Sequence, residues 1–115
     1  MTDEDRTKSE ATRMAEATTV RSLDDIRRLR PQIMELAGQY RARQVSVFGS
    51  CVRGEMHADS DIDFLVDFEE EYTLLDIAGM WNGLEDILGR KVDVIDRRGL
   101  REELRETVFR EAQAL

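Results

Sequence analysis

The Gly-Ser pair that begins at Gly49 and the Asp-Ile-Asp triplet that begins at Asp61 constrain the fold of this 115-residue chain more than any other feature. A short apolar run at residues 44–48 precedes the Gly-Ser pair, and a second at residues 62–68 begins within the Asp-Ile-Asp triplet. Such runs, bounded by turn residues, predict buried strands. The chain therefore has to end one strand at a tight turn and begin the next with two carboxylates. Core packing alone requires neither feature.

The apolar spacing also predicts where the domain begins. Residues 1–21 are polar and charged without a sustained apolar period, and we expect a flexible leader there. Residues 22–115 are expected to form one domain, because a chain of this length has room for a single modest core. Ser22 is a good N-cap for a first helix. Pro31 either starts a second helix or kinks a single one.

The second half of the chain alternates between helical and strand patterns. Thr73 is a candidate N-cap for a helix that Gly89 would close. Residues 91–95 predict a third strand and residues 100–112 a final helix. A helix between the second and third strands predicts a right-handed crossover. The apolar stripe of that helix comprises Leu74, Ile77, Trp81, Leu84 and Leu88.

Composition limits the partners of the chain. The formal net charge is −8, whereas binding to a nucleic-acid backbone relies on Lys and Arg to neutralise phosphates, so we expect no direct nucleic-acid partner. No apolar run approaches the roughly 20 residues of a membrane span, so we expect no membrane partner. The N-terminus has no apolar signal core, and the single cysteine, Cys51, fits a reducing compartment. We therefore expect a cytoplasmic protein.

Asp61 and Asp63 are expected to lie side by side, because positions i and i+2 of a strand point to the same face. That face is opposite to the one formed by Ile62, Phe64 and Val66. Two adjacent like charges repel each other, which disfavours ionisation of either carboxyl group. A bound Mg²⁺ would remove this penalty, since Mg²⁺ prefers oxygen ligands in near-octahedral geometry.

Asp93 supplies a third carboxylate. It lies between Val92 and Val94, which are expected to face the core, so Asp93 points to the opposite face of the third strand. If that strand lies beside the second, the three carboxylates converge. Such a cluster can hold one or two Mg²⁺ ions and activate an attacking hydroxyl. Asp93 is then a metal ligand, a general base or both, and the sequence leaves these roles open.

The Gly-Ser turn suits an anion. Gly49 lets the backbone approach a phosphate closely, and amides at a helix N-terminus, with the Ser50 hydroxyl, favour negative charge. Arg53 could contact the same phosphates, or it could pair with Glu55 or Asp59 instead. Together with a metal ion, these groups suit in-line attack on a nucleotide phosphate.

The segment from Phe48 to Val66 resembles the minimal nucleotidyltransferase family of the DNA-polymerase-β-like superfamily. The Gly-Ser pair, the interval and the Asp-x-Asp triplet all fall in register with that family. A second match is the Leu-Gly-Arg-Lys-Val-Asp stretch that ends at Asp93, and the Arg-Glu-Ala at residues 110–112 extends it. The resemblance covers the chain from about residue 22 to the C-terminus.

This resemblance implies an α/β (α+β) fold, with a small mixed sheet of three or four strands flanked by helices. It also implies ATP as the substrate and Mg²⁺ as the metal. Many members are antitoxins encoded beside a HEPN-type ribonuclease toxin, and some transfer AMP from ATP to a tyrosine of that toxin. The catalytic and metal-binding residues implied are Asp61, Asp63 and Asp93, and Gly49, Ser50 and Arg53 would bind the nucleotide.

Three functions stay open on the sequence alone. The first is a protein adenylyltransferase that acts as an antitoxin, with the acceptor site supplied by the partner protein. The second is an antitoxin that neutralises its toxin by binding alone, with a vestigial site. The third is a nucleotidyltransferase that modifies a small molecule.

Three other residues near the motif have simpler explanations. His57 lies in a polar loop, where we expect solvation rather than proton transfer. Cys51 has no base near it in the sequence, so we do not expect it to act as a nucleophile. Trp81 falls on the apolar stripe of its helix and is expected to pack in the core rather than to stack on a base.

Overall fold

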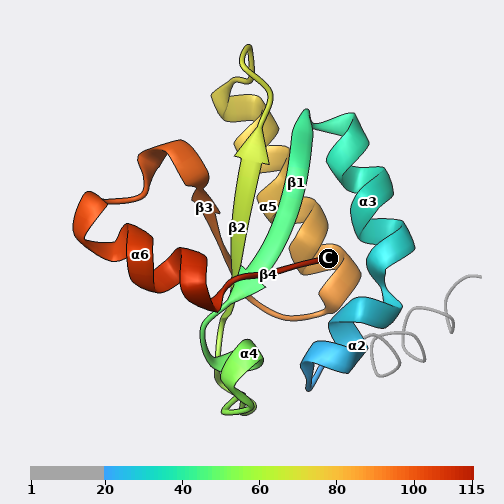
Figure 1. Ribbon diagram of the computed structural model, residues 1–115. Coiled ribbons are helices and arrows are strands. Elements are labelled where there is room, and N and C mark those ends of the chain that lie inside the picture. The colour runs from blue at the N-terminus through green and yellow to red at the C-terminus, as the bar shows by residue number, and fades with distance from the viewer. Residues whose placement is uncertain (1–19) are drawn as a thin grey trace, which may run out of the picture.

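A four-stranded mixed sheet organises the chain in the computed structural model, which describes residues 20–115 (Figure 1). Strand β1, Ala42–Phe48, pairs antiparallel with β2, Ile62–Phe68, which pairs parallel with β3, Val92–Asp96. A short β4, Gln113–Ala114, pairs antiparallel with β1 and completes the order β3-β2-β1-β4. This confirms the small mixed sheet expected from the sequence.

The N-terminal part of the described chain forms two helices. Helix α2, Leu23–Arg28, is capped by Ser22 as predicted, and the cap hydroxyl accepts a hydrogen bond from the backbone N–H of Asp25. Helix α3, Arg30–Gln39, starts separately with Pro31 in its first turn. Of the two alternatives for Pro31, the structure therefore has a second helix rather than one kinked helix.

The predicted leader, residues 1–21, lies outside the described residues apart from its last two. Val20 is described and is buried against the core. Strand β1 also begins earlier than predicted, at Ala42 rather than at residue 44, with a change of register between Ala42 and Gln44. The start of this strand was missed because Arg43 and Gln44 are exposed, so they add no apolar signal.

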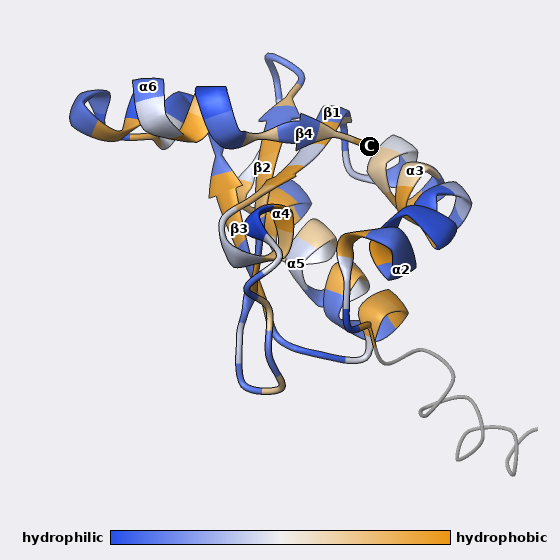
Figure 2. Cartoon of the chain, turned by 60° about the horizontal axis from the view of Figure 1, so that its bottom comes forward, coloured by the Kyte–Doolittle hydropathy of each residue, from blue (hydrophilic) through white to orange (hydrophobic). Residues whose placement is uncertain are grey.

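The main core lies between the sheet and the helices α3 and α5. Helix α5, Leu74–Leu88, connects β2 to β3 behind the sheet in the view of Figure 1, which gives the predicted right-handed crossover. The side chains that alternate toward α5 along β2 are fully buried. Figure 2 shows hydrophobic residues on β2 and β3 between the more hydrophilic outer helices. On this face the buried side chains of β2 are Ile62, Phe64, Val66 and Phe68, whereas Leu65 is buried on the opposite face.

Helix α5 has the predicted ends but not the whole predicted stripe. Thr73 forms a capping box with Asp76, and Gly89 closes the helix in the left-handed conformation, with φ of 70°. Trp81 packs against the core, as expected. The prediction for Leu74 is wrong, because its side chain is 80% exposed. Leu74 is the first residue of the helix, where the helix protrudes past the sheet (Figure 1).

Helix α6, Glu102–Glu111, lies on the opposite face of the sheet, after a short 3-10 helix η1, Arg97–Gly99. Val108 of α6 packs with Leu65 of β2 and with Leu100 in a second, smaller core. From α6 the chain runs directly into β4, so the end of this helix is fixed against β1. None of the helices within residues 20–115 combines the length and the apolar character needed to cross a membrane.

Gly79 lets α3 and α5 approach each other closely. A Cβ atom at Gly79 would collide with the ring of Tyr40. We therefore expect Gly79→Ala to lower the free energy of unfolding by about 1–3 kcal/mol, because overpacking outweighs the better helix propensity of alanine. Chemical denaturation followed by circular dichroism measures this change.

Gly38→Ala in α3 is the matched control. A Cβ atom at Gly38 meets nothing within 4 Å, so propensity alone acts there. This variant should gain about 0.5–1 kcal/mol. A Gly79→Ala protein as stable as Gly38→Ala would contradict the proposed helix contact.

Candidate functional site

Strands β2 and β3 bring two of the predicted carboxylates together. Asp63 and Asp93 are partners in the parallel ladder, and both side chains are half-buried. Each lies between residues whose side chains enter the main core, so both point to the opposite face of the sheet. Asp61 immediately precedes β2 and is exposed. The expectation that the third strand lies beside the second is confirmed.

The three carboxylates act on one another electrostatically. The pKa of Asp63 is raised from 3.8 to about 6, first by burial and then by the negative charges of Asp93 and Asp61. Arg53 acts in the opposite direction and lowers the pKa of Asp63. A like charge raises a carboxyl pKa chiefly at short range, so Asp93 and Asp61 both lie near Asp63.

The carboxylates nevertheless do not form a ready ligand set. Within residues 20–115, no group of three His, Cys, Asp or Glu side chains is placed to hold a metal ion. The chemistry of the donors fits Mg²⁺, because carboxylate oxygens are its usual protein ligands. Mutual repulsion separates such groups until a cation neutralises them.

Gly49 forms the turn between β1 and the short helix α4, Ser50–Arg53. Its φ of 83° lies in the left-handed region, which favours glycine. A Cβ atom there would also collide with the carboxylate of Asp63. The structure thus places the Gly-Ser turn directly against Asp63.

Arg53 is held by two carboxylates. Its Nε donates to Oε1 of Glu55 at 3.0 Å, and its Nη1 donates to Oε2 of Glu111 at 2.6 Å. Pairing with Glu55 was one of the alternatives left open by the sequence, whereas Glu111 was not predicted. The second oxygen of Glu111 accepts from the backbone N–H of Gly49 at 2.8 Å. Glu111 therefore connects Arg53 to the Gly-Ser turn.

The neighbouring residues behave as expected. Ser50 begins α4 and is half-buried beside the turn. Cys51 is buried, and burial together with Asp63 raises the pKa of its thiol to about 11. The thiol therefore stays protonated near neutral pH, which makes it a poor nucleophile. His57 is exposed in the loop before Asp61.

Arg90 fixes the loop that leads to Asp61, a role that the sequence did not reveal. Its guanidinium donates to the carbonyl oxygens of His57 at 2.9 Å and of Val20 at 2.7 Å, and also to that of Ser60. Both Arg90 and Glu111 belong to stretches that match the minimal nucleotidyltransferase family. The signal was therefore present, but neither residue carried an obvious chemistry.

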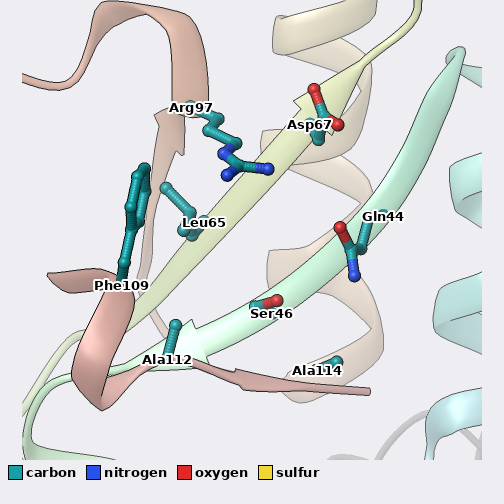
Figure 3. Close-up of a pocket in the computed structure, with 8 residues that line it drawn as sticks. All are labelled: Gln44, Ser46, Leu65, Asp67, Arg97, Phe109, Ala112 and Ala114. Carbon is teal, nitrogen blue, oxygen red and sulfur yellow. The ribbon is translucent and has the colours of Figure 1, made fainter. Parts of the chain in front are cut away.

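A separate cavity of about 220 Å³ lies further along the same face of the sheet (Figure 3). Arg97 stacks over the ring of Phe109 in its wall, 4.6 Å from the ring centroid. None of its lining residues was predicted to belong to the site. The cavity is lined by Gln44, Ser46, Leu65, Asp67, Arg97, Phe109, Ala112 and Ala114.

Sequence comparison relates the chain to nucleotidyltransferases. The family described as "Polymerase beta, Nucleotidyltransferase" matches residues 31–115. The protein adenylyltransferase MntA of Thermococcus cleftensis is 44% identical over 77 residues, which cover 67% of this chain and 78% of that protein. A candidate protein adenylyltransferase of Methanocaldococcus jannaschii is 33% identical over 88 residues, which cover 76% of this chain and 95% of that protein.

Solved structures share the fold. A structure described as a candidate minimal nucleotidyltransferase superposes with a TM-score of 0.74 at 47% identity, covering 82% of this chain and 96% of that chain. A toxin–antitoxin crystal structure with AMP-PNP gives a TM-score of 0.62 at 23% identity, covering 73% of this chain and 69% of that chain. The second likeness concerns the fold alone. The polymerase-β-like fold expected from the sequence is confirmed.

The raised pKa of Asp63 predicts a pH-dependent cost in stability. Because its pKa is 3.8 ordinarily and about 6 in the fold, the unfolded chain loses this proton first, and the folded protein loses stability as the pH rises between these values. The free energy of unfolding of Asp63→Asn should therefore exceed that of the wild type by on the order of 2 kcal/mol at pH 7. Below about pH 4 the two proteins should be equally stable. Urea denaturation across this pH range, with a chelator present, measures the difference.

Asp67→Asn provides the control for this measurement. Asp67 lies on the same face of β2 but pairs with Arg43 at 3.5 Å, so its replacement should bring no gain at pH 7. If Asp63→Asn is no more stable than the wild type at pH 7, the repulsion inferred between the carboxylates is wrong.

Arg90→Lys should loosen the loop before Asp61. Lysine keeps the charge, but its single nitrogen cannot span carbonyl groups from two segments, so we expect a loss of about 2 kcal/mol. The backbone N–H of Ser60 donates to the carbonyl oxygen of His57, and the backbone N–H of His57 donates to Oγ of Ser60. Hydrogen exchange of these two amides should become faster. The exposed neighbour Lys91 is the control, since Lys91→Ala should leave these amides protected. Unchanged hydrogen exchange in Arg90→Lys would contradict the role of Arg90 in holding this loop.

Proposed function

Because the chain belongs to the polymerase beta nucleotidyltransferase family, we propose that it is an antitoxin that transfers AMP from ATP to a partner protein. The acceptor would be a hydroxyl group, expected to be a tyrosine, of a HEPN-type ribonuclease toxin. The identity of 44% to a protein adenylyltransferase supports this class of reaction. The toxin–antitoxin complexes that share the fold support the kind of partner. We place the reaction in the cytoplasm, which suits the single reduced cysteine.

One observation carries the proposal. The glycine turn of Gly49 lies against Asp63, which is paired in register with Asp93. A nucleotidyl transfer needs anion-binding groups and acidic residues within the length of a triphosphate, and the contact between Gly49 and Asp63 supports such an arrangement. Either feature alone occurs in many proteins without such chemistry.

The residues of the Gly-Ser turn, Arg53 and the three aspartates each have a proposed role in the transfer. Ser50 and the amides at the start of α4 would bind the triphosphate, and Arg53 would add a donor beside them. Mg²⁺ bound by the three aspartates would supply positive charge to the triphosphate.

The reaction itself is a substitution at phosphorus. The acceptor hydroxyl would give its proton to a carboxylate, for which Asp93 is the candidate, and its oxygen would form a bond to the α-phosphorus. The bond from this phosphorus to the pyrophosphate oxygen would break at the same centre.

A second candidate function is neutralisation by binding alone. Two observations favour it over the third alternative, a small-molecule transferase. Within residues 20–115 the carboxylates do not form a ready metal-ligand set, and Arg53 is already engaged by Glu55 and Glu111. A vestigial site would have these properties, so catalysis has to be tested directly.

Incubation with ATP, Mg²⁺ and the HEPN-type partner should add AMP to that partner, as read by intact mass spectrometry. Asp61→Ala and Asp63→Ala should each lower the rate by at least about 100-fold, because the charge on the transferring phosphate would lose its counter-ion. Asp86→Asn on the exposed face of α5 is the control and should keep the wild-type rate.

The competing functions give different results. Neutralisation of the toxin without ATP, surviving in Asp63→Asn, would indicate binding alone. Transfer of a nucleotide to a small hydroxyl compound without any partner protein would indicate the third function. AMP additions that persist in Asp63→Ala would contradict the assigned site.

A further inference from the structure

Glu111 contacts two of the groups that the proposed function assigns to the nucleotide. We propose that Glu111 is a positioning residue that holds the Gly49 turn and Arg53 in the orientation that binds the triphosphate. This inference rests on the proposed function and adds a residue from the far end of the chain to its site.

The contacts of Glu111 are direct and use both carboxylate oxygens. One accepts from the backbone N–H of Gly49 at 2.8 Å, and the other accepts from Nη1 of Arg53 at 2.6 Å. The hydrogen bond from Arg53 lowers the pKa of Glu111, so the carboxylate is ionised at neutral pH. Charge-assisted hydrogen bonds of this kind are stronger than neutral ones and fix geometry more tightly.

The position of Glu111 is itself fixed by packing. It is the last residue of α6, whose Val108 is buried against Leu65 of the sheet. Only Ala112 separates it from β4, where Ala114 is the partner of Ser46 in β1. Helix α6, which packs on the sheet, and strand β4, which pairs with β1, therefore hold the carboxylate beside the Gly49 turn. Figure 1 shows the end of α6 beside β1.

Glu111 leaves donors free for a phosphate. A guanidinium has five N–H groups, and in Arg53 Glu55 engages Nε while Glu111 engages Nη1. The backbone N–H groups of Ser50 and Cys51, at the start of α4, have no acceptor among residues 20–115. An anion can therefore bind at the turn while Glu111 keeps its place.

In the opposite role, Glu111 would compete with the phosphate for the Gly49 turn and Arg53. In that case its carboxylate would occupy the anion site and would have to leave before ATP binds. The two roles predict changes of opposite sign, because removal of a positioning residue weakens nucleotide binding, whereas removal of a competitor strengthens it.

The test measures the affinity of the purified chain for ATP with Mg²⁺ by isothermal titration calorimetry. We expect Glu111→Gln to weaken ATP binding roughly tenfold, because the amide keeps the size but loses the charged bond to Arg53. Binding of adenosine, which has no phosphates, should be unchanged. Glu111→Asp, which keeps the charge, should recover part of the affinity.

Two further variants separate positioning from a general loss of structure. Glu106→Gln removes an exposed ion pair with Arg110 on the same helix and should bind ATP like the wild type. Arg53→Gln combined with Glu111→Gln should bind no more weakly than Arg53→Gln alone, because the amide oxygen of Gln can still accept from Gly49 and only the bond to Arg53 is lost. Circular dichroism confirms that each variant is folded.

The possible failures are distinguishable. ATP binding in Glu111→Gln that equals the wild type, or loss of adenosine binding along with ATP binding, would overturn the positioning role alone. Tighter ATP binding would overturn it in favour of the competitor. A wild-type chain that binds no ATP would overturn the proposed function and, with it, this inference.

Discussion

The parallel pairing of β2 with β3 is the contact on which the rest of the site depends. It sets Asp63 beside Asp93 on one face of the sheet, where burial and repulsion raise the pKa of Asp63 to about 6. The opposite face of the same strand buries Phe64 and Val66 completely. Burial of such side chains stabilises a fold by about 1.5–3 kcal/mol each, which offsets the cost of the paired carboxylates. Burial of the apolar face of β2 thus compensates for the repulsion between the carboxylates on its other face.

The groups that surround these carboxylates come from different parts of the chain. Arg53 is the cation that lowers the pKa of Asp63, and Glu111 holds it in place from the end of α6. Arg90 binds the loop before Asp61 from the other side. Helix α6 and its small core with Leu65 therefore serve the site as well as the sheet. A substitution that displaces Glu111 at the end of α6 can be expected to alter the Gly49 turn even without touching an aspartate.

Local patterns were sufficient to predict most elements. The cap at Thr73, the closing Gly89 and the alternation along β2 each depend on neighbours within a few residues, and all three are present in the structure. Leu74 was placed wrongly because periodicity reports the face of a helix but not where the helix passes beyond the sheet. Strand β4 has only two residues, Gln113–Ala114, and both are exposed, so it carries no apolar signal.

The sequence by itself determined the succession of the first three strands along the chain, the Gly-Ser turn and the identity of the candidate acidic residues. It could do so because spacing along one strand decides which side chains share a face. Only the tertiary structure decided that Glu111 bonds Gly49 and that Arg90 holds the loop before Asp61. Those contacts join residues that are far apart in the chain, and no local pattern encodes which distant backbone group a side chain will reach. The charge environment of Asp63 has the same origin, since burial and the neighbouring strand both arise on folding.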